Sequence, residues 1–265
     1  MSTLVTEKGI VHYQTYGSGA PVILLHGWLG SWDTWRTTIE ALSDDYRSYA
    51  IDLWGFGESD KKRGHFTVSD FVDLVNEFMD RLGIPSATLV GHSMGGTVSM
   101  RFAIKYPERV NKVVVVGSPV DGHSLTLLLK PFVYESIAGL IWRTPALFRL
   151  GMRLIYAPLI TREARTFYEM TARNTSATTL ESFFHSIASL YKTDLTPDLP
   201  AITVPALGVY GARDVLVNPN QHKLFSAGIP KGEVLYMPGS GHFPMLDEPE
   251  LFNQELRGFL QAPAN

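Results

Sequence analysis

The sequence predicts an α/β fold, in which a mainly parallel β-sheet carries helices on both faces. Residues 22–25 and 113–116 are apolar at every position, which is typical of strands buried on both faces of a parallel sheet. Such segments alternate along the chain with segments of helical periodicity, and this alternation indicates βαβ units. With 265 residues, of which 45% are hydrophobic and 18% charged, the chain can build one large core.

Hydrophobic periodicity and breaker residues place the individual elements. Residues 10–16 alternate between apolar and polar positions like a strand. The apolar residues of segment 68–82 fall on one helical stripe, and Gly83 is placed to end that helix. The other expected strands are 22–25, 47–51, 87–90, 113–116, 206–210 and 233–237, and the other expected helices are 31–42, 97–104, 219–227 and 249–260.

Charge and composition narrow the functional classes. The formal net charge is −3, which gives no sign of a nucleic-acid surface. The absence of cysteine excludes disulfides, cysteine-bound zinc and a thiol nucleophile. No segment reaches the roughly 18 apolar residues of a membrane span, and the N-terminus lacks the pattern of a secretory signal. We therefore expect a cytoplasmic protein that acts on a small molecule, with no nucleic-acid partner and no membrane span; its oligomeric state stays open.

Residues 121–199 differ in character from the rest of the chain. Strand patterns are absent there, and the segment is helical, rich in large apolar residues and interrupted by prolines such as Pro131 and Pro158. Because strand patterns resume at 206–210, this block is best explained as a helical lid inserted between two strands of the sheet. The expected domains are an α/β core, residues 1–120 and 200–265, and the lid, residues 121–199.

One stretch combines a strand end, a sharp turn and a helix start: Gly91-His92-Ser93-Met94-Gly95-Gly96. The pattern Gly-x-Ser-x-Gly is typical of a nucleophile elbow, in which the serine lies at the tip of a strained turn. Gly91 and Gly95 carry no Cβ atom that would collide with the flanking strand and helix. The helix N-terminus behind Ser93 favours a developing negative charge. Ser93 is therefore the candidate nucleophile, and His92 is expected to point away from it.

A serine hydroxyl needs a base to take its proton and a third group to orient that base. His242 follows the last expected strand through a Gly-Ser-Gly loop, and Asp214 follows the strand before it. Functional groups at the carboxyl ends of parallel strands can converge at one edge of the sheet, so both side chains can reach Ser93. Asp121, which lies just beyond the strand at 113–116, remains a second candidate for the acid.

The tetrahedral intermediate of acyl transfer carries an oxyanion that needs two preorganised donors. The backbone N–H of Met94, the residue after the nucleophile, is one candidate. The other is the backbone N–H of Trp28, in the loop after the first buried strand, where Gly27 allows a close approach and His26 braces the loop. This chemistry requires no metal and no organic cofactor. The substrate-binding residues stay unknown, with Trp28 and the lid (121–199) as candidates.

Five stretches form a combined pattern. They are His26-Gly27-Trp28, Asp52-x-x-Gly55-x-Gly57-x-Ser59, Gly91-His92-Ser93-Met94-Gly95-Gly96, Gly211-x-x-Asp214 and Gly239-x-Gly241-His242. Together they resemble the α/β-hydrolase superfamily, in its esterase, haloperoxidase-like and epoxide-hydrolase-like branch, over nearly the full chain. The resemblance implies an α/β-hydrolase fold with a mostly parallel eight-stranded sheet, flanking helices and an inserted lid. It also implies the order nucleophile, acid, base for Ser93, Asp214 and His242, and an architectural role for Asp52.

Departures from the family pattern narrow the range of reactions that we expect. Epoxide hydrolases and haloalkane dehalogenases of this branch carry aspartate at the elbow, where this chain has Ser93. Carbon–carbon bond hydrolases usually carry tryptophan after the catalytic histidine, where this chain has Phe243. Perhydrolases tend to have proline at the position of Leu29.

These features predict a serine carboxylesterase that works through an acyl-enzyme intermediate. The apolar lid favours uncharged esters of small to medium size. A lactonase, an amidase or a perhydrolase would use the same triad, and a ligand receptor of the same fold is a further alternative.

Overall fold

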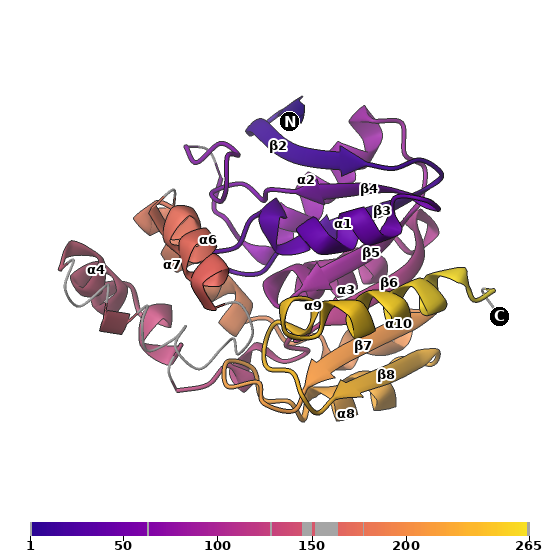
Figure 1. The fold of residues 1–265 in the computed structure, drawn as a ribbon. Coiled ribbons are helices and arrows are strands. Elements are labelled where there is room, and N and C mark those ends of the chain that lie inside the picture. The colour runs from indigo at the N-terminus through magenta and orange to yellow at the C-terminus, as the bar shows by residue number, and fades with distance from the viewer. Residues whose placement is uncertain are drawn as a thin grey trace.

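In the computed structural model, one eight-stranded sheet forms the centre of the protein (Figure 1). The structure describes residues 2–62, 64–127, 129–144, 150–151, 164–176 and 178–263, and of residues 164–168 it describes the backbone alone. The strands lie in the order β1-β2-β4-β3-β5-β6-β7-β8. Their bounds are β1 Ser2–Thr6, β2 Gly9–Tyr16, β3 Ala20–Leu25, β4 Tyr46–Ile51, β5 Ala87–His92, β6 Val110–Val116, β7 Ala206–Gly211 and β8 Gly232–Met237.

The sheet is parallel from β4 to β8 and antiparallel at its other edge, where β1 pairs with β2 and β2 pairs with β4. This arrangement confirms the predicted, mostly parallel sheet. β1 is absent from the elements predicted from sequence. It is an edge strand that is partly exposed, with Val5 at 68% exposure, so it lacks the buried apolar run that marks the central strands.

Helices cover both faces of the sheet. The helices of the described residues, including those of the segment between β6 and β7, are α1 Arg36–Leu42, α2 Val68–Arg81, α3 Met94–Lys105, α4 Glu135–Arg143, α6 Ala164–Ser176, α7 Leu180–Tyr191, α8 Gln221–Gly228, α9 Pro244–Asp247 and α10 Pro249–Gln261. α2, α3 and α8 pack on one face, and α1 and α10 pack on the other (Figure 1). Within the described ranges, no helix is long and apolar enough to cross a membrane.

Each face of the sheet has its own apolar core. Along the central strands, side chains alternate between the two: Ile23 and Leu89 lie in one core, and Leu24 and Val90 lie in the other. Successive side chains of a strand point to opposite faces, so a strand covered on both faces is apolar at every position. This is the physical reason for the uninterrupted apolar runs in the sequence.

α2 shows how local signals set the ends of an element. The Thr67 hydroxyl accepts a hydrogen bond from the N–H of Asp70, and the Asp70 carboxylate accepts one from the N–H of Thr67. This reciprocal pair is a capping box, which satisfies backbone donors that a helix start leaves open. Beyond the last turn, Gly83 has a φ of +64°, the left-handed conformation that ends many helices. The predicted helix and its glycine stop are confirmed.

The chain between β6 and β7, here called the inserted segment (117–205), carries α4, α6 and α7. In its described part the segment forms no strand, although isolated bridges join Asp121 to Asp194 and Leu125 to Val217. Figure 1 shows its helices beyond the end of the sheet toward which β7 and β8 point. The carboxyl ends of the parallel strands therefore face the inserted segment. Of the predicted lid, residues 128, 145–149, 152–163 and 177 lie outside the described residues.

Candidate active site

β5 passes into α3 through Ser93, whose backbone lies at φ +50° and ψ −117°. Such a conformation is strained for a residue with a side chain. The Ser93 N–H donates to the carbonyl of Val116 over 2.8 Å. A Cβ atom at Gly91 would lie 2.2 Å from the carbonyl oxygen of Gly95, and one at Gly95 would lie 2.3 Å from that of Leu25. Backbone crowding therefore demands glycine on both sides of Ser93, as the elbow pattern predicts.

His242 and Asp214 form a buried pair, with Nδ1 of His242 2.7 Å from Oδ2 of Asp214. A carboxylate only accepts hydrogen bonds, so Nδ1 carries the proton and Nε2 of the neutral ring presents a lone pair. The other carboxylate oxygen, Oδ1, accepts from the backbone N–H groups of Leu216 (2.8 Å) and Val217 (3.0 Å). The loop after β7 thus holds the carboxylate in one orientation toward the imidazole.

Asp121, the second candidate for the acid, lies in a different environment. Its carboxylate accepts from the backbone N–H of His123 and contacts ring atom Nδ1 of the same residue, both at 2.9 Å. These contacts cap a short turn at the surface. Of the two predicted acids, Asp214 is the one in contact with His242.

Ser93, His242 and Trp28 line one cavity of about 30 Å³. The other described residues that line it are His92, Leu125, Leu129, Ile187, Leu190, Leu216 and Phe243. Met94 is buried at the start of α3, where the first N–H groups of a helix have no partner within it. Among the described residues, no three histidine or acidic side chains are arranged to hold a metal ion. The structure therefore places the predicted nucleophile and base around one small, largely apolar space, with the predicted acid in contact with the base.

Trp28 joins the loop after β3 to the inserted segment. Its indole N–H donates to the carbonyl of Phe183 in α7 over 2.9 Å. Its ring lies 4.7 Å from the ring of Phe183 and 6.0 Å from that of Phe132. The next residue, Leu29, has a φ of +59°. Proline cannot adopt this value, because its ring holds φ near −65°. One aromatic side chain thus ties the predicted oxyanion loop to α7.

The same loop approaches the elbow closely at Gly27. A Cβ atom there would lie 2.8 Å from Nδ1 of His92 and 3.0 Å from Cβ of Ser93. His26 braces the loop, because its Nδ1 donates to the carbonyl of Gly27 (2.7 Å) and its Nε2 accepts from the N–H of Leu53 (3.0 Å). Burial lowers the pKa of His26, so the ring stays neutral and keeps this donor and acceptor pattern.

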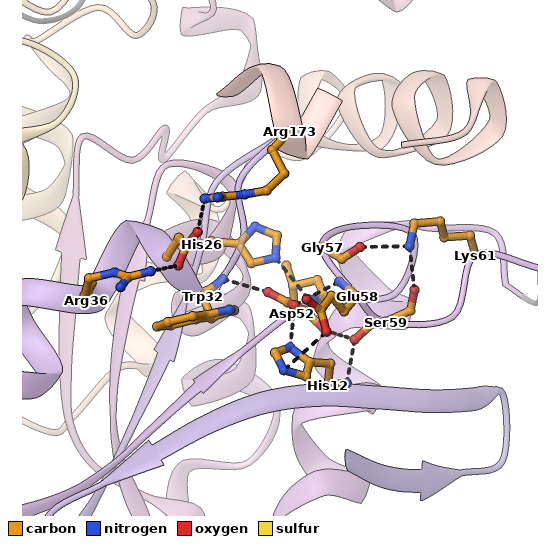
Figure 2. Close-up of polar contacts among 12 residues, drawn as sticks. His12, His26, Trp32, Arg36, Asp52, Gly57, Glu58, Ser59, Lys61 and Arg173 are labelled. Atoms are coloured by element: carbon orange, nitrogen blue, oxygen red, sulfur yellow. Dashed lines mark hydrogen bonds and ion pairs between the residues drawn. The ribbon is translucent and has the colours of Figure 1, made fainter. Parts of the chain in front are cut away.

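Asp52 connects three segments of the chain (Figure 2). Its carboxylate accepts from the N–H of Trp32 (2.7 Å), the N–H of Glu58 (3.0 Å) and Nδ1 of His12 (2.7 Å). The hydroxyl of Ser59 donates to the Asp52 carbonyl and accepts from the N–H of His12. These bonds hold the loops after β3 and β4 against β2, which is the architectural role that the family resemblance implies for Asp52.

The His12–Asp52 bond provides a test of this network by pH. The bond raises the pKa of His12 above its ordinary value of 6.5, against the opposing effect of burial. A raised folded-state pKa contributes stability that is fully present below the unfolded pKa and is lost as pH rises through the folded pKa. We expect the difference in Tm between the wild-type protein and His12→Gln to be largest near about pH 5.5 and to shrink toward about pH 9. Thermal unfolding followed by circular dichroism measures it.

The control for this experiment is His65→Gln, which removes an exposed histidine. Its Tm should follow that of the wild type at every pH. A difference between wild type and His12→Gln that grows as pH rises would contradict the assigned ion pair.

His92 is placed differently from the expectation that it points away from the serine. It lines the same cavity as Ser93, and its ring lies 4.7 Å from the ring of His242. Its Nε2 atom is 2.9 Å from the carbonyl oxygen of His242. No local pattern signals this contact, because 150 residues separate the two histidines.

Comparisons with known proteins agree with the fold. A family model described as alpha/beta hydrolase fold matches residues 20–249. A 2-hydroxy-6-oxononadienedioate/2-hydroxy-6-oxononatrienedioate hydrolase of Paraburkholderia phymatum is 32% identical over 264 residues, which cover 94% of this chain and 90% of that protein. A pimeloyl-[acyl-carrier protein] methyl ester esterase of Vibrio vulnificus is 25% identical over 255 residues, covering 94% and 97%. The chain belongs to the α/β-hydrolase fold family, and its activity is that of a hydrolase.

A solved structure supports the same fold assignment. The enol-lactonase of Burkholderia xenovorans aligns with a TM-score of 0.87 at 20% identity, covering 98% of this chain and 100% of that one. At 20% identity, this similarity supports the fold assignment alone.

Proposed function

We propose that the protein is a serine carboxylesterase, with Ser93 as nucleophile, His242 as general base and Asp214 as the group that orients the base. The observation that carries this proposal is the buried 2.7 Å contact between His242 and Asp214, beside a cavity that Ser93 lines from the tip of a strained turn. This combination suits nucleophilic acyl transfer, because it supplies an attacking oxygen, a base and a fixed tautomer.

The reaction follows from these positions. Oγ of Ser93 attacks the ester carbonyl carbon while Nε2 of His242 takes the hydroxyl proton, and the carbonyl oxygen becomes an oxyanion. The backbone N–H groups of Met94 and Trp28 donate to this oxyanion. The intermediate then breaks its bond to the alcohol oxygen, and the alcohol leaves with the proton from His242. Water, deprotonated by His242, attacks the acyl-enzyme, which releases the carboxylic acid and restores Ser93. Asp214 balances the positive charge of the His242 imidazolium during both acylation and deacylation.

We assign the role of a lid to the predicted segment 121–199. α7 contributes Ile187 and Leu190 to the cavity around Ser93, and it is tied to Trp28. A space of about 30 Å³ holds roughly two water molecules, so an ester enters only when side chains over Ser93 move away. The aliphatic walls favour an uncharged ester with a short acyl chain.

A second candidate is the reaction named for the Paraburkholderia phymatum relative. The dioate in that name carries two carboxylates, which cationic side chains bind best. No lysine or arginine is among the described residues that line the cavity, and Phe243 stands where carbon–carbon bond hydrolases usually carry tryptophan. Among the acyl-transfer alternatives, the φ of Leu29 disfavours the proline-containing loop of perhydrolases. These points favour an esterase over the dienedioate hydrolase and over a perhydrolase.

A substrate panel tests the proposal. The panel contains p-nitrophenyl esters from acetate to palmitate, a γ-lactone, an anilide and a 2-hydroxy-6-oxo-dienedioate. We expect kcat/KM to be highest for the short esters and to fall as the acyl chain outgrows the cavity. A fluorophosphonate probe should label Ser93, and prior labelling should abolish ester turnover. A higher kcat/KM for the lactone, the anilide or the dienedioate than for any ester would overturn the assignment as a carboxylesterase.

A further inference from the structure

His92 lies at the end of β5, one residue before Ser93, and is 2% exposed. Side chains of a strand alternate between faces, so His92 shares the face of Val90, whose side chain lies in the core beneath α1 and α10. Phe243 packs against that core, and its ring lies 4.5 Å from the ring of His92. The side chain of His92 is thereby brought against the loop that carries His242.

The direction of the bond from His92 to this loop is determined by chemistry. A carbonyl oxygen only accepts, so Nε2 of His92 must carry the proton that it shares with the His242 carbonyl at 2.9 Å. Nδ1 of the neutral ring is then a bare acceptor, and it is buried with no hydrogen-bond partner among the described residues. Burial, with the neighbouring His242, lowers the pKa of His92 well below its ordinary value. The ring therefore stays neutral and keeps a single donor, which points at His242.

Hydrogen bonds hold the backbone at Gly241 and at the carbonyl of His242. The N–H of Gly241 donates to the carboxylate of Asp247 over 2.7 Å, and the carbonyl of His242 accepts from His92. The imidazole itself is held by Asp214 on one side and contacts the ring of His92 at a centroid distance of 4.7 Å and an interplanar angle of 61°. His92 thus contacts both the backbone and the ring of the proposed base.

We propose that His92 is a positioning residue for catalysis, whose Nε2–H bond to the His242 carbonyl and whose ring contact hold the His242 imidazole in line between Asp214 and Ser93. This inference rests on the function proposed above. A general base must transfer a proton first from Ser93 and then to the leaving alcohol, so its ring must stay in place through both halves of the reaction. A misplacement of about 1 Å can lower a catalysed rate by about 10²-fold.

Three substitutions of His92 separate the hydrogen bond from the volume of the ring. His92→Gln places an amide N–H close to the position of Nε2, whereas His92→Asn is too short to reach the His242 carbonyl, and His92→Phe keeps a ring without a donor. We expect His92→Asn and His92→Phe to lower kcat by about 10- to 100-fold with KM within about twofold of wild type, since positioning of the base acts on chemistry rather than on ground-state binding. His92→Gln should recover most of the lost kcat.

The matched control is His222→Phe. In the wild-type protein, Nδ1 of His222, in the first turn of α8, also lies 2.7 Å from a backbone carbonyl, that of Pro219 in the preceding loop. This variant should keep the wild-type kcat.

A spectroscopic measurement adds a readout that does not depend on turnover. The Nδ1 proton of His242, shared with Asp214 over a short distance, should give a downfield proton NMR resonance. We expect this resonance in the wild type, His92→Gln and His222→Phe, and we expect it to broaden or disappear in His92→Asn and His92→Phe.

Two results would overturn the inference. One is a wild-type kcat in both His92→Asn and His92→Phe. The other is equal loss of kcat in all three His92 variants with an unchanged His242 resonance, which would make His92 a space-filling residue. If Ser93→Ala kept full activity, the proposed function itself would fail. If Ser93→Ala were inactive and the His92 variants normal, the positioning role alone would fail.

Discussion

Replacement of Ser93 by alanine is expected to lower kcat for short p-nitrophenyl esters by about 10⁴- to 10⁶-fold. Without the hydroxyl no acyl-enzyme forms, and only the rate supplied by oxyanion stabilisation and substrate binding remains. The backbone at position 93 is strained with either side chain, and Gly91 and Gly95 still relieve the crowding around it. The fold should therefore survive, with a circular dichroism spectrum like that of the wild type. Ester hydrolysis at high enzyme concentration measures the residual rate.

The control for the nucleophile is Ser226→Ala, which changes an exposed serine in α8. This variant should keep the wild-type kcat and should still be labelled by a fluorophosphonate at Ser93. Turnover by Ser93→Ala at more than about a hundredth of the wild-type rate would contradict the assignment of the nucleophile.

Replacement of Asp214 by asparagine is expected to lower kcat by about 10⁴-fold. Oδ1 of Asp214 accepts two backbone N–H bonds, from Leu216 and Val217, so the amide oxygen of asparagine takes that position. Its NH₂ group then faces Nδ1 of His242, which must accept instead of donate. Nε2 consequently carries the proton in the neutral ring and cannot take one from Ser93. The initial rate of ester hydrolysis under saturating substrate measures the effect.

Asp121→Asn is the matched comparison. Asp121 also follows a strand, and for that reason it was the second candidate for the acid. Its carboxylate binds the turn at His123, so this substitution should change kcat by less than about threefold. The assignment of the acid would be wrong if Asp121→Asn proved more damaging than Asp214→Asn. The pair tests the choice between two carboxylates that sequence reasoning left open.

The features predicted well from sequence are those produced by local sterics and periodicity. Gly91 and Gly95 are needed because backbone atoms of neighbouring segments lie within 2.3 Å of any added Cβ. α2 and α10 were located by their apolar stripes, and the central strands by their apolar runs. β1 and the four-residue helix α9 were missed, since one is a partly exposed edge strand and the other is too short to show a period.

The contacts that shape the cavity have no such local signature. Trp28 reaches the carbonyl of Phe183 across 155 positions of the chain, and His92 reaches that of His242 across 150. Each of these bonds depends on how far one loop extends over the end of a strand. A pattern of residue types carries no information on that distance.

The sequence by itself determined the α/β class, the elbow at Ser93 and the strand ends from which Asp214 and His242 extend. Short-range crowding requires glycine, and burial on both faces of a sheet requires apolar residues, so both can be recognised in the sequence. Only the tertiary structure decided that Asp214 rather than Asp121 contacts His242, that Trp28 is tied to α7, and that His92 lies against the proposed base. These are contacts between segments distant in the chain, and packing of the whole sheet and its insertion sets their geometry.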